Sequence, residues 1–207
     1  VPYGARVFRI RYTTQDRGQP VQATALVGVP YLPNGTPETR PLTAWTHGTT
    51  GFMGECAPSY EGGGDLFGVY LLASLGYVVA APDYIGLDAE ADFSQPPPVL
   101  HAYLNIEQTA IGTLDSLRAA VALAETEGTA VQPATNEVVM WGGSQGGHAA
   151  MAADLLAPYY APELGVVATV AMVPPTDLLG IADYAVTSPN PASVAVAAML
   201  VANHTWY

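Results

Sequence analysis

A serine enclosed by glycines is the feature of this chain best suited to chemistry. The pentapeptide Gly142-Gly143-Ser144-Gln145-Gly146 fits the pattern G-x-S-x-G, which places a serine on a very sharp turn. Neighbouring chain passes so close to such a turn that only glycine, which lacks a Cβ, is tolerated at Gly142 and Gly146. The Ser144 hydroxyl is therefore a candidate nucleophile, able to attack a carbonyl carbon and form a covalent intermediate.

The segments on either side must place this turn between a strand and a helix. The run Val138–Trp141 is apolar and strand-like, and His148–Leu156 has the composition of a helix. A simpler interpretation is a glycine-rich loop that contains an incidental serine. The strand before the turn and the helix after it favour the nucleophile turn, called a nucleophile elbow.

Similar strand and helix units recur along the chain. Residues 6–14 and 22–29 predict a hairpin, because a turn-forming run separates them. Short apolar runs then alternate with helix-like segments, which is typical of a parallel sheet with helices on both faces. The expected strands are 42–46, 77–81, 138–141 and 166–173. The expected helices are 65–75, 103–125, 148–156 and 191–203. His101 is expected at the start of the second of these helices, and residues 176–180 could begin a further one.

Composition and charge limit the possible functions. The 207 residues are 50% hydrophobic, which is enough to bury a large core. The apolar runs are too short to predict a transmembrane segment, and the first residues lack the features of a signal peptide, which either never existed or has been removed. A net charge of −12, without a single lysine, excludes nucleic-acid binding through repulsion. No cofactor is signalled and no metal site is expected, because Asp83 and Asp88 lack companion ligands at the spacing of a calcium loop.

Four blocks of sequence, in a fixed order, resemble a known family. They are Trp45–Gly51, Cys56–Tyr60, Ala81–Leu87 and Gly143–Ala149. Together they resemble the secretory lipase family of the α/β-hydrolase superfamily, over most of the chain. The resemblance implies an α/β-hydrolase fold, with a mostly parallel sheet, helices on both faces and a helical cap that starts after the sixth strand. The core would occupy residues 1–175 and the beginning of the cap or lid residues 176–207, with the last strands of the fold lacking from this chain.

The resemblance also implies an activity and the residues that perform it. It indicates a secreted carboxylic ester hydrolase, extracellular or periplasmic, that acts on a small-molecule or lipid ester. Ser144 would be its catalytic nucleophile. The backbone N–H groups that stabilise the oxyanion would belong to Gln145 and to either Thr49 or Thr50, in the loop after the strand that ends at His47.

The acid and the base that such a serine needs are harder to find. In this fold they follow the nucleophile in the order acid, then histidine. His148 lies only one helical turn beyond Ser144 and is expected to pack or to form hydrogen bonds. Asp177 and His204 are the remaining partners by position. The preferred expectation is that acid and base lie beyond Tyr207, on a C-terminal fragment or a second chain that completes the fold.

The sequence leaves open the partner of the single cysteine and two alternative functions. The family counterpart of Cys56 pairs with a cysteine of the cap region, and this chain contains no second cysteine. The elbow alone does not separate an esterase or lipase from a serine peptidase of the same fold. A non-catalytic binding module that kept the fold but lost the triad is the alternative from a different functional class.

Overall fold

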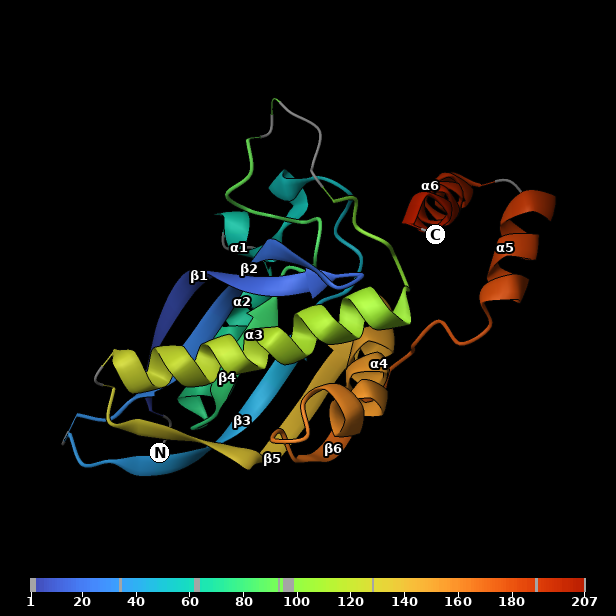
Figure 1. Ribbon diagram of the computed structural model, residues 1–207. Helices are drawn as coiled ribbons and strands as arrows, with labels where there is room; N and C mark the ends of the chain where they lie inside the picture. Colours follow the sequence, from blue (N-terminus) through green and yellow to red (C-terminus); the bar gives the residue numbers. More distant parts are fainter. Residues whose placement is uncertain are drawn as a thin grey trace.

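The first two strands form a hairpin at one end of the sheet. The structure is a computed structural model that describes residues 3–33, 35–61, 64–92, 94, 99–127, 129–188 and 190–206. Strands β1 (Gly4–Asp16) and β2 (Gln19–Tyr31) pair antiparallel, as predicted (Figure 1). Arg17 and Gly18 form the turn, and their positive φ angles of 49° and 75° suit a two-residue hairpin loop, whose twist matches that of the strands.

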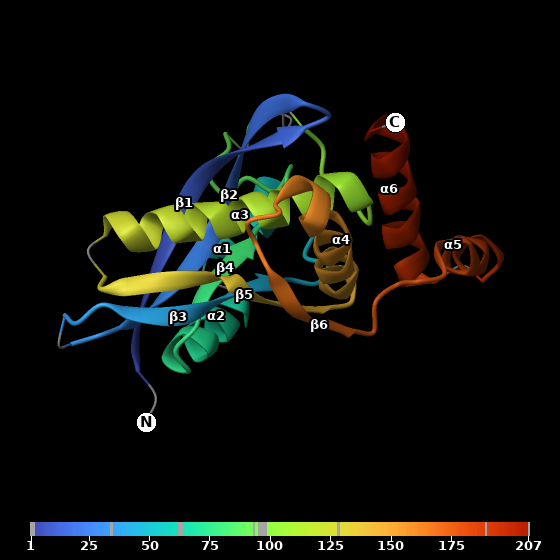
Figure 2. The same cartoon turned by 60° about the horizontal axis from the view of Figure 1, so that its bottom comes forward.

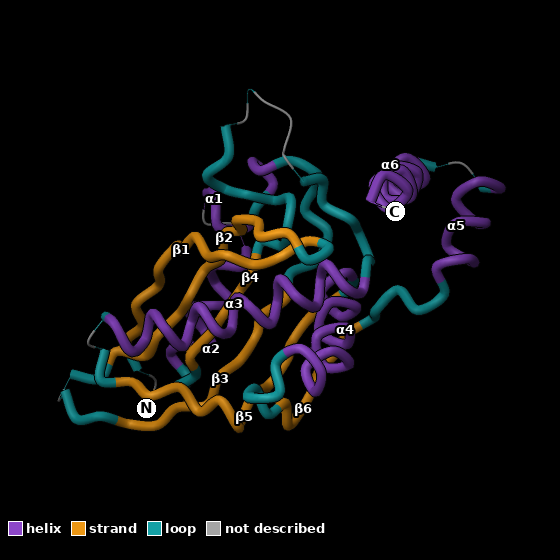
Figure 3. The backbone as a smooth tube through the Cα atoms, viewed as in Figure 1, coloured by secondary structure: helices purple, strands orange, loops and turns teal. Residues whose placement is uncertain are grey.

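Six strands of the described residues form one mixed sheet in the order β1-β2-β4-β3-β5-β6. The bounds of the last four are β3 (Glu38–Thr46), β4 (Val78–Pro82), β5 (Val131–Gly143) and β6 (Val166–Met172). Strand β2 pairs antiparallel with β4, whereas β4, β3, β5 and β6 run parallel. Figure 3 shows the strands of this sheet in orange. The predicted parallel sheet is confirmed, with β5 beginning seven residues before the expected position 138.

Helices cover both faces of this sheet. Helix α2 (Gly64–Ser74) packs on one face, and α3 (Ile106–Thr126) and α4 (Gln145–Tyr160) pack on the other (Figure 2). Two short helical segments, η1 (Gly54–Cys56) and α1 (Pro58–Glu61), precede α2. The larger core lies between the sheet and the pair α3 and α4, where Leu114 and Leu117 of the predicted apolar stripe are fully buried. The smaller core lies under α2.

Helix α3 begins later than predicted. The expectation of a helix from residue 103 with His101 at its start is wrong, because the helix begins at Ile106. The Asn105 side chain accepts a hydrogen bond from the backbone N–H of Gln108 at 2.9 Å and so caps the first turn. Residues 99–105 form a loop instead, in which His101 and Tyr103 are buried.

Two further helices follow β6 and lie to one side of the sheet. They are α5 (Leu178–Thr187) and α6 (Pro191–Trp206), the orange and red helices of Figure 1. They contact each other, and the Asn203 side chain of α6 donates a hydrogen bond to the carbonyl oxygen of Tyr103. The division into a core of residues 1–175 and a cap segment of residues 176–207 stays a prediction. No helix within the described ranges is both long enough and apolar enough to cross a membrane.

Candidate active site

Ser144 occupies the sharp turn between β5 and α4. Its backbone has φ 56° and ψ −123°, a conformation that residues with a Cβ rarely adopt. The Ser144 N–H donates to the carbonyl oxygen of Met172, in β6, at 2.8 Å, and the residue is exposed. A strained backbone therefore holds a serine hydroxyl at the surface, between the end of a central strand and the first turn of a helix.

The glycines around Ser144 are needed for steric reasons. A Cβ on Gly142 would lie 2.1 Å from the carbonyl oxygen of Gly146, and a Cβ on Gly146 would lie 2.0 Å from that of Thr46. Both distances are far below van der Waals contact. By contrast, the nearest atom to a Cβ on Gly143 would be 3.8 Å away, in Met172. Thus the first and last glycines of the motif allow β3, β5 and α4 to approach one another, whereas Gly143 has room for a side chain.

The loop after β3 passes beside the elbow. A Cβ on Gly48 would be 4.0 Å from the Cβ of Ser144. His47 is buried, and its ring nitrogens lie 2.6 Å from the Gly48 carbonyl oxygen and 3.2 Å from that of Asp83. Since a carbonyl oxygen only accepts, the ring holds the loop in place by donating to one of these oxygens, or to both when it carries two protons. Thr49 and Thr50, which follow, are exposed.

Gln145 directs its side chain inward, away from the surface. The residue is 2% exposed, and its side-chain nitrogen lies 2.7 Å from Nε2 of His101. Burial lowers the pKa of His101 to about 3, so this histidine is neutral. His101 was predicted to begin a helix and was missed as part of the site. Its only signal in the sequence was its type, because its position depends on tertiary contacts.

The predicted partners of Ser144 have other surroundings in the structure. Asp177 is exposed and accepts a hydrogen bond from the Gly180 N–H at 2.8 Å, as the N-cap of α5. His204 is exposed in the last turn of α6. Among the described residues, no hydrogen bond or ion pair joins Ser144, Asp177 and His204.

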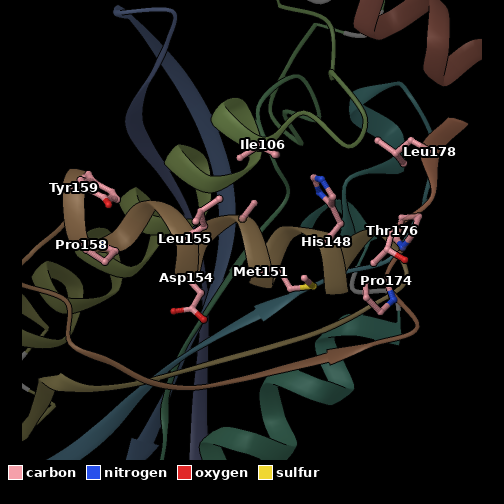
Figure 4. Close-up of a pocket in the computed structure, with 12 residues that line it drawn as sticks. Ile106, His148, Met151, Asp154, Leu155, Pro158, Tyr159, Pro174, Thr176 and Leu178 are labelled. Carbon is pink, nitrogen blue, oxygen red and sulfur yellow. The ribbon is translucent and has the colours of Figure 1, made fainter.

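His148 lines a groove along α4. The groove measures about 730 Å³, and Figure 4 shows His148 projecting from α4 toward the space between Ile106 and Leu178. Its Nδ1 is buried and has no hydrogen-bond partner within the described part of the chain, and burial lowers its pKa. Apolar side chains line most of the groove, including Met151 and Leu155 of α4.

A buried carboxylate, Asp83, lies close to the same loops. It accepts hydrogen bonds from the hydroxyls of Thr24 and Ser59, at 2.6 and 2.5 Å, and from the backbone N–H of Ser59. Burial raises its pKa, although these three bonds oppose the shift. Asp88 instead pairs with Arg11 at 2.7 Å. In the described ranges, no group of three histidine, cysteine or acidic side chains could hold a metal ion.

Cys56 packs against the loop that follows β3. Its thiol is free, and a Cβ on Gly51 would lie 2.3 Å from its sulfur. The pairing implied by the resemblance therefore stays a prediction that concerns a cysteine outside these 207 residues.

The sheet order, the elbow and the adjoining loop define the class of protein as an α/β-hydrolase, and solved structures agree. The esterase LipA of Xanthomonas oryzae, described as degrading the rice cell wall, superposes with a TM-score of 0.69 at 28% identity, over 87% of this chain and 46% of its own. Lipase A of Candida antarctica gives a TM-score of 0.67 at 22% identity, over 97% of this chain and 45% of its own, a likeness of fold alone.

The family model of secretory lipases matches residues 59–200, and the chain belongs to that family. Lipase A of Arthroderma benhamiae is 32% identical over an alignment 179 residues long, which covers 79% of this chain and 34% of that protein. The chain thus spans between about a third and a half of the length of these relatives. Both the fold and the family expected from the sequence are confirmed.

Proposed function

We propose that this chain carries the nucleophilic part of a secreted carboxylic ester hydrolase, which acts through an acyl-enzyme on Ser144. The observation that carries the proposal is the strained Ser144 backbone, exposed between two obligatory glycines and beside the loop after β3. Membership of the secretory lipase family supports ester chemistry and export from the cell.

The reaction begins when the Ser144 oxygen attacks the ester carbonyl carbon and passes its proton to a histidine. Negative charge then develops on the carbonyl oxygen. The backbone N–H of Gln145 is proposed as one donor to this oxyanion, and that of Thr49, or else of Thr50, as the second. Two such donors contribute several kcal/mol to transition-state stabilisation, at about 3–4 kcal/mol each. The alcohol leaves with the proton held by the histidine, and water hydrolyses the acyl-enzyme in the same way.

The histidine and its acid are proposed to come from outside these 207 residues. Ring nitrogens of His47 and His101 are already engaged by carbonyl oxygens and by Gln145. Within the described residues β6 forms the outer edge of the sheet, and the side chains of Val167 and Met172 there are 62% and 50% exposed. An apolar edge of this kind is suited to pairing with a further strand, from a C-terminal segment or a second chain, that brings acid and base to Ser144.

The strain at Ser144 argues against a non-catalytic binding module. A residue with a Cβ in such a conformation costs about 1–3 kcal/mol of stability. A module without chemistry gains nothing from a hydroxyl at this position, where glycine would be free of the strain. The substrate class is proposed as neutral or lipid esters, because a chain with a net charge of −12 repels anionic molecules.

Labelling with a fluorophosphonate probe tests the proposal on the natural protein that contains this chain. Modification is expected at Ser144 and should be lost in Ser144→Ala, together with hydrolysis of p-nitrophenyl esters, which falls by at least about 10³-fold. Ser188→Ala, which alters another exposed serine, is the matched control and should keep both. Reaction of the probe elsewhere, or faster cleavage of aminoacyl anilides than of esters, contradicts the proposal.

A further inference from the structure

The loop of residues 99–105 is held in place by contacts with the segments before and after it. A Cβ on Gly86 would lie 2.3 Å from the backbone nitrogen of His101, so this glycine, at φ 92°, allows the loop to close on the segment after β4. The Ala102 N–H donates to the Gln108 side chain at 2.9 Å. Consequently His101, which is fully buried, has a fixed position next to the start of α4.

The two hydrogen bonds of His101 define which nitrogen carries its proton. Nδ1 lies 3.1 Å from the carbonyl oxygen of Ile85, which can only accept, so Nδ1 is the donor. The Nε2 lone pair is then free to accept from the side-chain N–H of Gln145, at 2.7 Å. The Gln145 side-chain oxygen is buried without a partner among the described residues, so His101 provides the hydrogen bond that fixes this amide.

His101 also packs within a row of aromatic rings that extends to the loop after β3. Tyr84 lies parallel to His101 with ring centres 5.5 Å apart, and it stacks on His47 at 4.3 Å. The Tyr84 hydroxyl donates to the His47 carbonyl oxygen at 2.9 Å. On the other side, Tyr103 meets His101 edge-on at 4.4 Å, and its hydroxyl accepts from the Gly51 N–H at 3.1 Å. The buried His101 ring therefore contacts Gln145 directly and, through Tyr84 and Tyr103, is connected to both ends of the loop 47–51.

We propose that His101 is a positioning residue, which sets the distance between the Gln145 N–H and the N–H groups of the loop 47–51 through its hydrogen bond to the Gln145 side chain. The inference rests on the proposed function, because these groups are the donors assigned to the oxyanion. Stabilisation of an oxyanion needs donors about 2.7–3.1 Å from one point. A displacement of about 1 Å in such a site lowers the rate on the order of 10²-fold.

Paired substitutions in the natural protein separate positioning from packing. His101→Asn keeps a donor for Ile85 but loses the acceptor for Gln145, whereas His101→Gln places an acceptor near the Nε2 position. Gln145→Met removes the side-chain amide and keeps the backbone N–H. As a control, Tyr12→Phe deletes another buried hydrogen bond, from the Tyr12 hydroxyl to the Gly112 carbonyl oxygen at 2.9 Å.

We expect His101→Asn and Gln145→Met each to lower kcat by about 10- to 100-fold with little change in KM. The double variant should be no slower than the slower single variant, because both changes break one contact. His101→Gln should recover most of kcat, and Tyr12→Phe should leave it unchanged. Losses that multiply in the double variant, or His101→Gln no better than His101→Asn, would overturn the proposal.

Nitrogen NMR of the histidine rings gives a readout that needs no activity. His101 is expected as the Nδ1–H tautomer, and Gln145→Met should shift its Nε2 resonance while Tyr12→Phe does not. An Nε2–H tautomer overturns the inference. Failure of the proposed function is seen separately, as hydrolysis that survives Ser144→Ala. If Ser144→Ala abolishes hydrolysis while His101→Asn and Gln145→Met leave kcat intact, only the role of His101 is wrong.

Discussion

At the scale of single residues, contact distances distinguish the glycines of the elbow from one another. Gly142 and Gly146 face carbonyl oxygens of neighbouring segments at distances that leave no room for a methyl group. Gly143, between them in the motif, faces only the flexible end of Met172. The motif therefore contains two obligatory glycines and a third glycine that is replaceable.

Replacing Gly146 by alanine tests this distinction. We expect Gly146→Ala to destabilise the protein by about 3 kcal/mol or more, since the new methyl group meets backbone of β3 that cannot move independently. Gly143→Ala should change the free energy of unfolding by less than about 1 kcal/mol. Urea unfolding of both variants measures the difference. Equal stabilities for the two variants would show that the elbow is looser than described.

The sequence predicted the sharp turn at Ser144 but not the residues that surround it. Ser144 was recognised because its neighbours in the chain carry the whole pattern, strand, glycines and helix. His101 and Asp83 could not be recognised in the same way, because their partners are distant in the sequence: Gln145 is 44 residues from His101, and Thr24 is 59 residues from Asp83. The local sequence around a residue does not indicate such long-range contacts.

At the scale of elements, the residues that cap helices α3 and α5 explain where the sequence-based predictions and the structure differ. The apolar stripe of α3 was predicted because its residues recur at helical spacing. The start of the helix was placed too early, because residues 101–105 were predicted as part of it. In the structure, Asn105 caps the helix, so that the helix begins at the next residue. Similarly, Asp177 was considered as a catalytic acid, and the structure gives it a capping role at α5.

Two substitutions of Asp177 separate the capping role from the catalytic one. Asparagine caps helices as well as aspartate does, so Asp177→Asn should leave ester hydrolysis and α5 unchanged, whereas Asp177→Ala should cost about 1 kcal/mol of helix stability. Amide hydrogen exchange of α5 and a hydrolysis assay measure the two effects. A loss of about 10⁴-fold in kcat for Asp177→Asn would instead identify Asp177 as the acid of a triad.

At the scale of the whole molecule, an acidic chain contains a buried carboxylate whose hydrogen bonds, within the described residues, come from neutral groups. Asp83 is fully buried, and its hydrogen bonds come from neutral hydroxyl and amide groups. Burial raises its pKa above the usual 3.8, so the folded protein holds this proton more tightly than the unfolded chain. The contribution of Asp83 to stability is therefore largest at low pH and decreases as the pH rises from below 3.8 through the folded-state pKa.

The variant Asp83→Asn should lose this pH dependence. We expect the free energy of unfolding of the variant, relative to the wild type, to increase as the pH rises through that window and to become constant above it. Denaturant unfolding at a series of pH values from 4 to 8 measures the difference, since all other acidic groups titrate in both proteins. A difference that is the same at every pH would show that the pKa of Asp83 is not raised.

The overall architecture followed from the alternation of strands and helices, which fixed the parallel part of the sheet. The order of the strands could not be predicted in this way. Strand β2 of the hairpin pairs with β4 and not with β3, the next strand in the sequence. That arrangement depends on long-range pairing, for which the chain has no local signal. The family resemblance implied a mostly parallel sheet, and the order of its strands comes from the structure.

The exposed outer edge of β6 has a consequence for how this segment must be handled. Within the described residues β6 has a pairing partner on one side only, so this almost wholly apolar strand offers its outer backbone N–H and carbonyl groups to any extended chain nearby. As long as that edge is open, self-association through it competes with folding, and the competition grows with protein concentration.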